Sequence, residues 1–500
     1  MMKFLASVLL VSVAVFGAPF ASADTGADPL EGLDAAIESA REQWHAPGLA
    51  VAIVKDDRVV FAKGYGTRHL GENEPVDSHT VFTLASTSKA FVATSIGMLV
   101  DEGKLSWDDP VIRHLPEFKV ADPYVTREVT LRDLLSHRTG VEEMDVLWSR
   151  GLLPAQALPH MAYGEQATSL RSAWGYNNMM YVAAAEVVAR VSGMPFEEFV
   201  TQRIFKPLGM TDSLFTGPQL AQRKNVTGAH LVENGRARRT EPYVSRAPLG
   251  AAGVQSSAED MAKWLRMLLN QGKAGDKSIV KAETLGETLQ AQIVMPAPMY
   301  PAAVQAKPHF FGYGMGWFVQ DYKGRLLAMH TGSLYGANAL AAIVPEEKLG
   351  LVILINAGPV EYRHAFMYDV IDRFIGARGK DWNGDLLELE AKLAQDARQS
   401  ADEKRKARVS APPSVRLDAF TGKYSHPLAG DVEVVQRKDG KLAVLMPPDA
   451  SFTLTHWSYD TFEASDDRAP EETFLLTFQR GTDGKIASYQ IENGKQYKRQ

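Results

Sequence analysis

The 500-residue sequence predicts an α/β (α+β) domain followed by a small antiparallel β-domain. Two observations predict the first domain: strand-like segments occur near both of its ends, and helical patterns fill most of the chain between them. A third observation predicts the second domain, because short strand-like runs alternate with turns from residue 417 onward. We therefore expect an antiparallel sheet built from both ends of the first domain, with a helical insertion between them.

The first elements after the N-terminal segment are a helix and a hairpin. Apolar residues recur at helical spacing over residues 33–44. Residues 49–54 and 59–62 are strand-like and flank the polar turn 55–58, which predicts a β-hairpin.

The middle of the first domain is predicted to be mainly helical. An apolar helix should begin near Ser86 and end just before Gly103, because glycine is favoured directly after a helix C-terminus. Residues 104–325 show helical patterns and loops, among which 179–191 and 258–271 are the clearest helices.

Strand character returns towards the end of the first domain. Residues 326–330, 339–344 and 351–355 are strand-like, and the segment 345–348 predicts a turn between the last two. A helix over residues 361–375 should then close the domain.

The composition changes after this helix. A charged helical pattern over residues 385–408 and the pair Pro412-Pro413 predict a connecting helix and a linker. Turns such as Asp439-Gly440 then separate the short strands of the β-domain. The predicted organisation is a signal peptide (1–23), the first domain (24–377), a charged helical connector and linker (378–413), and the small antiparallel β-domain (414–500).

The N-terminus predicts a cleaved secretory signal. Lys3 precedes an apolar run over residues 4–16, and Ala21-Ser22-Ala23 supplies a cleavage site of small residues. A membrane anchor is the competing interpretation, but the run is shorter than the ~20 residues that a spanning helix needs. We therefore expect a periplasmic protein with no stable membrane anchor after cleavage; an extracellular location is the alternative.

The composition excludes several classes of function. The formal charge of -6, without a basic block, argues against nucleic acid as a partner. The absence of cysteine excludes disulfides, a lipoprotein anchor, a thiol nucleophile and cysteine-ligated metal. The 12 histidines include no His-Glu-x-x-His pattern, so we expect no metal site and no cofactor.

The segment Ser86-Thr87-Ser88-Lys89 is the strongest candidate for catalysis. Lys89 follows Ser86 by three positions at the start of an apolar helix, which places the hydroxyl and the amine on one face. Burial and the positive helix N-terminus disfavour an ammonium ion, so Lys89 could accept the serine proton near neutral pH. The same spacing at Ser278 and Lys281 follows a polar, turn-like stretch, and we interpret it as a chance match.

Two further motifs follow in order, Tyr176-Asn177-Asn178 and His330-Thr331-Gly332. Serine-x-x-lysine, tyrosine-x-asparagine and a lysine- or histidine-threonine-glycine strand, in this order, resemble the signature of the penicillin-recognising serine hydrolases. The class A β-lactamases carry a variant of it. From about residue 33 to 377 the chain resembles the β-lactamase-related serine hydrolases, which include class C β-lactamases, DD-peptidases, D-aminopeptidases and esterases. Supporting stretches are Thr130 to Gly140, Pro207 to Met210 and Gly312 to Trp317. The resemblance implies a β-lactamase/penicillin-binding-protein-like catalytic domain, and the β-domain resembles the small lipocalin-like barrel often appended to it.

The resemblance also implies roles for individual residues. Ser86 would be the nucleophile, and Lys89 and Tyr176 would move protons. The backbone N–H groups of Ser86 and Ser333 would form the oxyanion hole. The predicted substrate-binding residues are Asn178, His330, Thr331 and Gly332.

His330 stands where many family members carry lysine. A histidine with an ordinary pKa near 6.5 is largely neutral at pH 7, so recognition of a substrate carboxylate should be weaker than with lysine. The alternative interpretation is a structural strand histidine.

The expected function is a secreted serine hydrolase that cleaves amide or peptide bonds through a Ser86 acyl-enzyme. A carboxylesterase or weak β-lactamase is one alternative, and a penicillin-type sensor that stays acylated, or a non-catalytic binding protein, is another. The expected partner is a small peptide, amide or ester substrate, and the sequence leaves oligomerisation open.

Overall fold

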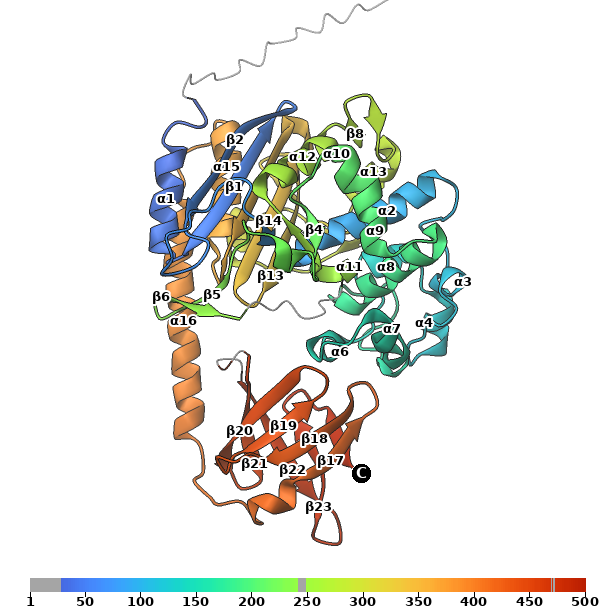
Figure 1. Cartoon of the computed structure of the whole chain (residues 1–500), viewed down its shortest axis with the longest axis vertical. Helices are drawn as coiled ribbons and strands as arrows, with labels where there is room; N and C mark the ends of the chain where they lie inside the picture. Colours follow the sequence, from blue (N-terminus) through green and yellow to red (C-terminus); the bar gives the residue numbers. More distant parts are fainter. Residues whose placement is uncertain (1–27, 242–248, 469, 471–472) are drawn as a thin grey trace, which may run out of the picture.

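The structure is a computed structural model that describes residues 28–241, 249–468, 470 and 473–500. The predicted signal peptide, residues 1–23, lies outside these residues. The described chain forms a large domain of sheet and helices and a closed barrel of eight strands, joined by one long helix (Figure 1). The predicted fold class is therefore confirmed.

The centre of the large domain is an eight-stranded sheet in which every neighbouring pair is antiparallel. Its strands, in sheet order, are β10 (Ile293–Val294), β11 (Phe311–Tyr313), β12 (Phe318–Tyr322), β13 (Arg325–Leu334), β14 (Ala337–Val344), β15 (Leu349–Ile355), β1 (Gly48–Lys55) and β2 (Arg58–Gly66). The two ends of the domain meet where β1 pairs with β15, with Val51 opposite Ile353.

Three strands of this sheet lie in the segment that the sequence assigned to helices and loops. β10 and β11 have two and three residues, and β12 has five. Elements this short carry almost no period-2 signal, so the pattern of residues 104–325 could not separate them from loops. Their pairing with the longer β13 brings them into the sheet.

The sheet has a buried core on each face. Ala50, Ala52 and Val54 of β1 face the helical insertion, whereas Leu49 and the other alternate residues of β1 face the opposite core. The helix α12 (Ala258–Leu269) packs on β1 and β15 on the insertion side, and α15 (Tyr362–Phe374) packs on β14 and β15 with the second core. This alternation, with both faces buried, explains the nearly continuous apolar run of β1.

The insertion consists of helices and small sheets. Its helices are α2 (Lys89–Asp101), α3 (Val111–His114), α4 (Pro123–Glu128), α5 (Leu131–Leu135), α6 (Val146–Ser149), α7 (Pro154–Ala157), α8 (Asn178–Ser192), α9 (Phe196–Val200), α10 (Lys206–Leu208), α11 (Leu249–Ala252), α12, α13 (Ala282–Thr288) and α14 (Pro301–Ala306). Three small sheets contain β3 (Phe82–Thr83), β7 (Val254–Ser256) and β4 (Leu214–Phe215); β16 (Ala357–Gly358), β5 (Ala229–Glu233) and β6 (Arg236–Thr240); and β8 (Lys273–Ala274) and β9 (Lys277–Ser278).

The helix α16 (Trp382–Lys406) runs from the large domain, beside α1 (Leu33–Gln43), towards the barrel (Figure 1). Trp382 and Leu386 are its buried residues, and its second half is exposed and charged. No helix of the described chain combines the length and the apolarity that a bilayer span requires.

The barrel closes because its first and last strands pair, with Tyr424 opposite Arg499. Its strands are β17 (Gly422–His426), β18 (Gly430–Gln436), β19 (Leu442–Met446), β20 (Ala450–Ser458), β21 (Thr461–Asp466), β22 (Thr473–Arg480), β23 (Ile486–Ile491) and β24 (Gln496–Arg499). Closure leaves no free sheet edge, which is how small β-domains avoid edge-to-edge association.

The barrel is attached to the large domain through buried polar contacts. Arg150, next to α6, is 8% exposed, and its guanidinium donates hydrogen bonds to the carbonyl of Pro447, at 2.9 and 2.7 Å, and to the carbonyl of Ala429. Leu428 packs into the core of the large domain, and Lys495 forms an ion pair with Glu142 at 3.2 Å. These contacts hold α6 against the barrel.

Candidate active site

Ser86 lies in a short 3-10 turn, Ala85–Ser88, that leads directly into α2. The preceding residue, Ala85, is buried and has φ of 48°, a left-handed conformation that costs an alanine roughly 1–2 kcal/mol. Such strain persists only where the surrounding structure holds it, and it is found preferentially at functional turns. The turn therefore presents Ser86 at a sharp corner of the chain.

Lys89 is the first residue of α2 and is 0% exposed. Its Nζ atom donates to Ser86 Oγ at 3.1 Å, to Asn178 Oδ1 at 2.8 Å and to the Ala251 carbonyl at 3.0 Å. Burial lowers the pKa of Lys89 to about 7, although the Asp145 carboxylate acts in the opposite direction. A substantial fraction of Lys89 is therefore neutral at pH 7 and able to accept a proton.

Tyr176 contacts the same hydroxyl from the other side. Its phenol donates to Ser86 Oγ at 2.8 Å, and Lys89 Nζ lies 4.8 Å from the centre of the Tyr176 ring. Burial raises the pKa of Tyr176 well above its usual value, even though the hydrogen bond with Ser86 lowers it. The phenol therefore keeps its proton at neutral pH and can act as a donor.

Asn178 connects Lys89 to Asp145. Its Oδ1 accepts from Lys89, while its Nδ2 lies 3.1 Å from both carboxylate oxygens of Asp145. The neighbouring Asn177 has a different role: it is the N-cap of α8, and its side chain accepts from the Met179 backbone N–H. Of the two asparagines, only Asn178 reaches the candidate site.

Replacing Asp145 by asparagine should shift the pH dependence of Ser86 acylation. Asp145→Asn removes the negative charge that favours the Lys89 ammonium, so the Lys89 pKa should fall. The acid limb of the rate profile, where acylation slows as Lys89 gains a proton, should therefore move to lower pH by roughly one unit or less. Rates of acylation between pH 5 and 9 measure this, with the exposed turn residue Asp439→Asn as the control. An acid limb that moves to higher pH would contradict the electrostatic role of Asp145.

The strand β13 forms the opposite wall and passes very close to Ser86. A Cβ atom on Gly332 would lie 2.1 Å from the Leu84 carbonyl oxygen and 3.0 Å from the Ser86 backbone nitrogen. Thr331 and Ser333 line the Ser86 cavity from this strand. The approach of β13 therefore requires glycine at position 332, and it brings Ser333 near Ser86 as the predicted oxyanion hole requires.

The change Gly332→Ala should move β13 away from Ser86. A methyl group cannot fit against the Leu84 carbonyl, so we expect a loss of about 1–3 kcal/mol in unfolding free energy and about a tenfold or greater loss of acylation rate. Thermal unfolding and acylation rates measure the two effects. Gly286→Ala in α13 is the matched control, because a Cβ atom there meets nothing within 4 Å; equal behaviour of the two variants would refute the packing argument.

The structure places His330 behind the cavity rather than in it. The side chain is 1% exposed, and its ring nitrogens lie 2.8 Å from the Tyr313 hydroxyl and 2.7 Å from the Thr331 carbonyl oxygen. Burial lowers the pKa of His330 to about 3, so the ring is neutral. Alternation along β13 puts Thr331 and Ser333 on the cavity side, and this placement differs from the expectation that the His330 side chain meets substrate.

A second buried histidine, His137, supports Tyr176. Its ring centre lies 4.4 Å from that of Tyr176, and its Nδ1 accepts from the Asn177 backbone N–H at 3.1 Å. The His137 carbonyl accepts from the Gly175 N–H at 2.8 Å. Burial lowers the pKa of His137 well below its usual value, so the ring is neutral and acts by packing and hydrogen bonding.

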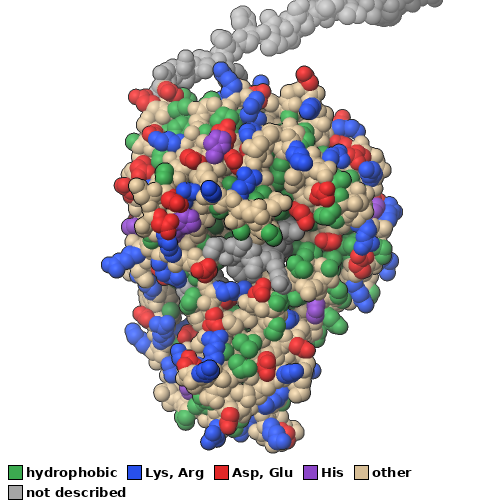
Figure 2. Space-filling view, in the orientation of Figure 1, with side chains coloured by type: hydrophobic (Ala, Val, Ile, Leu, Met, Phe, Trp, Pro, Cys, Tyr) green, Lys and Arg blue, Asp and Glu red, His purple; other side chains and the backbone are tan. Residues whose placement is uncertain are grey.

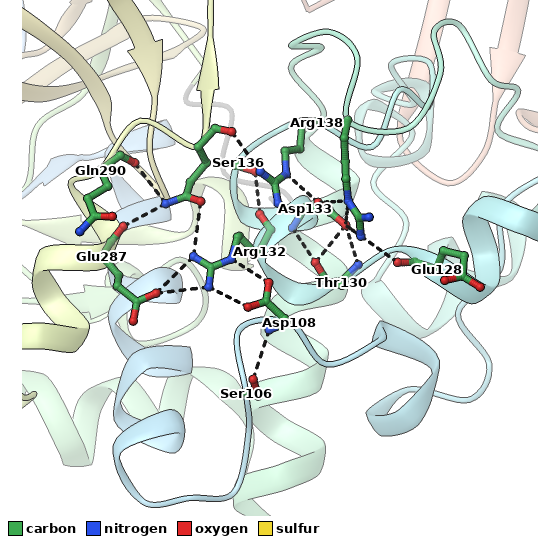
Figure 3. A network of polar contacts seen from close by, with 12 residues as sticks. Ser106, Asp108, Glu128, Thr130, Arg132, Asp133, Ser136, Arg138, Glu287 and Gln290 are labelled. Atoms are coloured by element: carbon green, nitrogen blue, oxygen red, sulfur yellow. Dashed lines mark hydrogen bonds and ion pairs between the residues drawn. The ribbon is translucent and has the colours of Figure 1, made fainter.

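The segment around His137 is held by a polar network (Figure 3). Asp133, which is fully buried, caps α5 by accepting from the backbone and side chain of Thr130, and it also accepts from Arg138 at 2.6 Å and from Arg171 at 2.8 Å. Burial would raise the pKa of Asp133, but the hydrogen bonds from Arg171, Thr130 and Arg138 lower it overall. Arg132 reaches Glu287 in α13 at 3.2 Å. Residues 130–140 thus stabilise the segment that carries His137 and, through it, the position of Tyr176.

The cavity at Ser86 has a volume of about 230 Å³. Its lining includes six residues that the sequence analysis did not select: Asp145, Trp148, Ala252, Met299, Tyr300 and Leu334. A neighbouring cavity of about 640 Å³ shares Trp148 and Ser333 with it and extends to Asp466 and Arg468 of the barrel. In the space-filling view, acidic and basic side chains are interspersed over the described surface of both domains (Figure 2).

The remaining sequence expectations concern Ser278 and metals. Ser278 lies in the exposed hairpin β8–β9, and the Lys281 Nζ atom bonds the Asp101 carbonyl oxygen rather than the serine. Within the residues that the structure describes, no group of three or more histidine, aspartate or glutamate side chains could hold a metal ion.

The chain is similar to several known proteins. The chain is 26% identical over 501 residues to the unguisins hydrolase ungD of Aspergillus violaceofuscus, covering 88% of this chain and 84% of the relative. It is 24% identical to protein flp of Staphylococcus aureus over 338 residues, covering 66% of this chain and 63% of the relative.

Two solved structures share the fold. The octameric penicillin-binding protein homologue from Pyrococcus abyssi superimposes with a TM-score of 0.61 at 23% identity, covering 94% of this chain and all of that chain. EstCE1, a hydrolase with promiscuous acyltransferase activity, gives a TM-score of 0.58 at 20% identity, covering 70% of this chain and 98% of that chain.

Two family profiles divide the chain. Residues 406–500 match a domain of unknown function, DUF3471. Residues 33–372 match the profile described as Beta-lactamase, and the resemblance proposed from the motifs is confirmed. Since this match spans more than half of the 500 residues, the chain belongs to the beta-lactamase family of serine hydrolases.

Proposed function

We propose that the protein cleaves amide or peptide bonds through an acyl-enzyme on Ser86. The observation that carries this proposal is the position of Ser86 Oγ, which is in hydrogen-bond contact with the Lys89 amine at 3.1 Å and with the Tyr176 phenol at 2.8 Å. A nucleophile held between a neutral amine and a protonated phenol has both a base and an acid at hand.

The reaction would run in two steps. Ser86 transfers its proton to neutral Lys89 while Oγ attacks the substrate carbonyl carbon, and the N–H groups of Ser86 and Ser333 stabilise the oxyanion. The bond to the leaving group then breaks, and the leaving amine or alcohol receives a proton from Tyr176, which Lys89 reprotonates. Water, deprotonated by the same pair, attacks the acyl carbonyl and frees Ser86.

The side chains that line the cavity favour substrates that carry no free carboxylate beside the scissile bond, since Arg363, which donates to Ser333 Oγ at 2.8 Å, is ion-paired with Glu361. Of the described residues that line the cavity, Asp145 alone has a formal charge, and His330, where related enzymes often carry lysine, is neutral. We therefore place efficient β-lactam hydrolysis third among the candidate activities. Peptides and amides come first and carboxylic esters second; the named relatives support hydrolysis in general, since one is an unguisins hydrolase and EstCE1 is a hydrolase with promiscuous acyltransferase activity.

The test is a matched substrate panel on the purified protein. An amide and an ester of the same acyl group, together with nitrocefin, should show acylation and release, with kcat/KM falling from amide or ester to nitrocefin. Single-turnover experiments separate acylation from deacylation. An acyl-enzyme that forms but persists for hours would favour the sensor alternative, and the absence of any adduct on Ser86 would sink the proposal.

Secretion to the periplasm belongs to the same proposal. Its support is the sequence of residues 1–23 and the absence of cysteine from the chain. The mass of the mature N-terminus, recovered from a periplasmic fraction, tests it, and a chain that starts at Met1 in the cytoplasmic fraction would contradict it.

A further inference from the structure

The interior of the barrel is hollow on the side that meets α6. A cavity of about 420 Å³ lies there, within the size range of small-molecule sites. Its apolar lining comes from four strands, β19, β20, β22 and β23, and includes Val444, Phe452, Phe474, Leu476 and Ile491. The cavity is open to the surface and not enclosed, so a ligand could enter it.

The rest of the barrel interior is filled, which shows that the hollow is local. The rings of Phe420, Phe462 and Phe478 contact one another, with centroids 4.7 to 5.7 Å apart, and all three are buried. The barrel is therefore wide enough to be packed by aromatic rings, and it is packed in this way except in the part that lies against α6.

Two buried phenols supply polar contacts in the hollow. Tyr489 and Tyr497 are 2% and 4% exposed, line the cavity, and stack with their ring centres 4.7 Å apart. Among the described residues, neither hydroxyl oxygen belongs to the enclosed side-chain atoms that lack a partner, so both are open to the cavity. A phenol that lines a cavity can donate a hydrogen bond to an oxygen atom of a ligand there.

The charged side chains that line the cavity are acidic, whereas the Arg150 guanidinium acts on the Tyr497 hydroxyl from nearby while it is bonded to the Pro447 and Ala429 carbonyls. The charged residues among its described lining are Asp145 and Glu492, and both are acidic. The two carboxylates on the lining oppose a carboxylate or phosphate group and leave an uncharged hydroxyl or ester group unaffected.

The same cavity lies next to the candidate active site. Asp145 lines both this cavity and the one at Ser86, and Val146 of α6 packs against the barrel core. A molecule in the barrel would therefore touch the segment whose Asp145 holds Asn178 and, through it, Lys89.

We propose that the barrel interior binds an elongated, uncharged apolar chain that carries one hydrogen-bond acceptor, such as a long-chain alcohol or alkyl ester. Such a chain could be a free ligand or the apolar end of a substrate held at Ser86. The acceptor would bond to Tyr489 or Tyr497, and the chain would lie against Phe474, Leu476 and Ile491.

The first experiment measures binding of the neutral fluorescent probe N-phenyl-1-naphthylamine to the full chain. The variant Ile491→Trp fills the cavity, whereas Val435→Trp places the same ring at a half-buried position of β18 that does not line it. We expect Ile491→Trp to weaken probe binding about tenfold or more, since a misfit of one methylene group already matters in an apolar pocket. The Val435→Trp variant should bind the probe as tightly as the unsubstituted protein does.

Competition tests the chemistry of the ligand. Octanol should displace the probe, and octanoate should do so at least about tenfold less well because of the acidic lining. The double variant Tyr489→Phe, Tyr497→Phe removes two hydroxyl groups and keeps the two rings. It should therefore bind the probe as before and bind octanol severalfold more weakly. It also keeps the proposal testable if Ile491→Trp does not fold. Absence of probe binding to the full chain, or equal binding by both tryptophan variants when folded, would overturn the proposal.

Two further measurements distinguish a free ligand from the apolar end of a substrate held at Ser86. If the ligand is free, blocking Ser86 with a small fluorophosphonate leaves probe binding unchanged. If it is the end of a substrate, Ile491→Trp raises KM for an octanoate ester and leaves that for an acetate ester unchanged. Probe binding needs no turnover. The barrel proposal can therefore fail while the Ser86 mechanism stands, and the Ser86 mechanism can fail while the barrel proposal stands.

Discussion

The variant Ser86→Ala is expected to lose acylation and turnover completely, by about 10⁴-fold or more, while the fold is retained. The substitution removes the nucleophilic atom and leaves Lys89 and Tyr176 without their shared hydrogen-bond partner. Intact-protein mass spectrometry after treatment with a fluorophosphonate should show one adduct on the natural chain and none on the variant. Circular dichroism checks that the variant is folded.

The matched control is Ser278→Ala, which removes the serine of the second Ser-x-x-Lys match. This serine lies in an exposed hairpin, and Lys281 contacts Asp101 instead. The control should be acylated at the natural rate. An adduct mapped to Ser278, or turnover that survives in Ser86→Ala, would remove Ser86 from the mechanism.

The variant Lys89→Met should lower the acylation rate by about 10²–10⁴-fold, the usual contribution of a positioned base. Methionine has a similar length and suits an apolar site, so packing is largely kept. The natural chain should also show an acid limb near pH 7, because Lys89, with a pKa of about 7, must lose its proton before it can accept one from Ser86. The rate therefore rises as the pH passes upward through about 7.

Acylation rates between pH 5 and 9 measure both effects, with the half-exposed Lys104→Met as the control. The acid limb should disappear in Lys89→Met and persist in Lys104→Met. A Lys89→Met chain that keeps the limb and the rate would show that another group is the base.

Much of the fold could be predicted from local patterns in the sequence. The hairpin of β1 and β2, the helices α8 and α12 and the strand pair β14–β15 carry their periodicity within a few residues, and the structure has all of them. The three motifs could also be found, since Ser86, Lys89, Tyr176 and Asn178 do come together within hydrogen-bond distance. Burial of Lys89 followed from the apolar residues beside it.

Other features depend on residues far apart in the chain, and no local pattern reveals them. The short strands β10 and β11 exist because β12 and β13 extend the sheet to them. His330 stands in the right motif, yet its ring turns towards Tyr313, because neighbours on a strand alternate between faces and the tertiary packing decides which face borders the cavity.

The sequence by itself determined the family, the order of the domains and the catalytic candidates, because these rest on residue identity and on short-range spacing. The tertiary structure alone decided that Asp145 borders Asn178, that His137 packs on Tyr176 and that the barrel is hollow beside α6. Each of these depends on the packing of elements tens to hundreds of residues apart. Packing of this kind is set by the whole core, and its result is not encoded in any one segment.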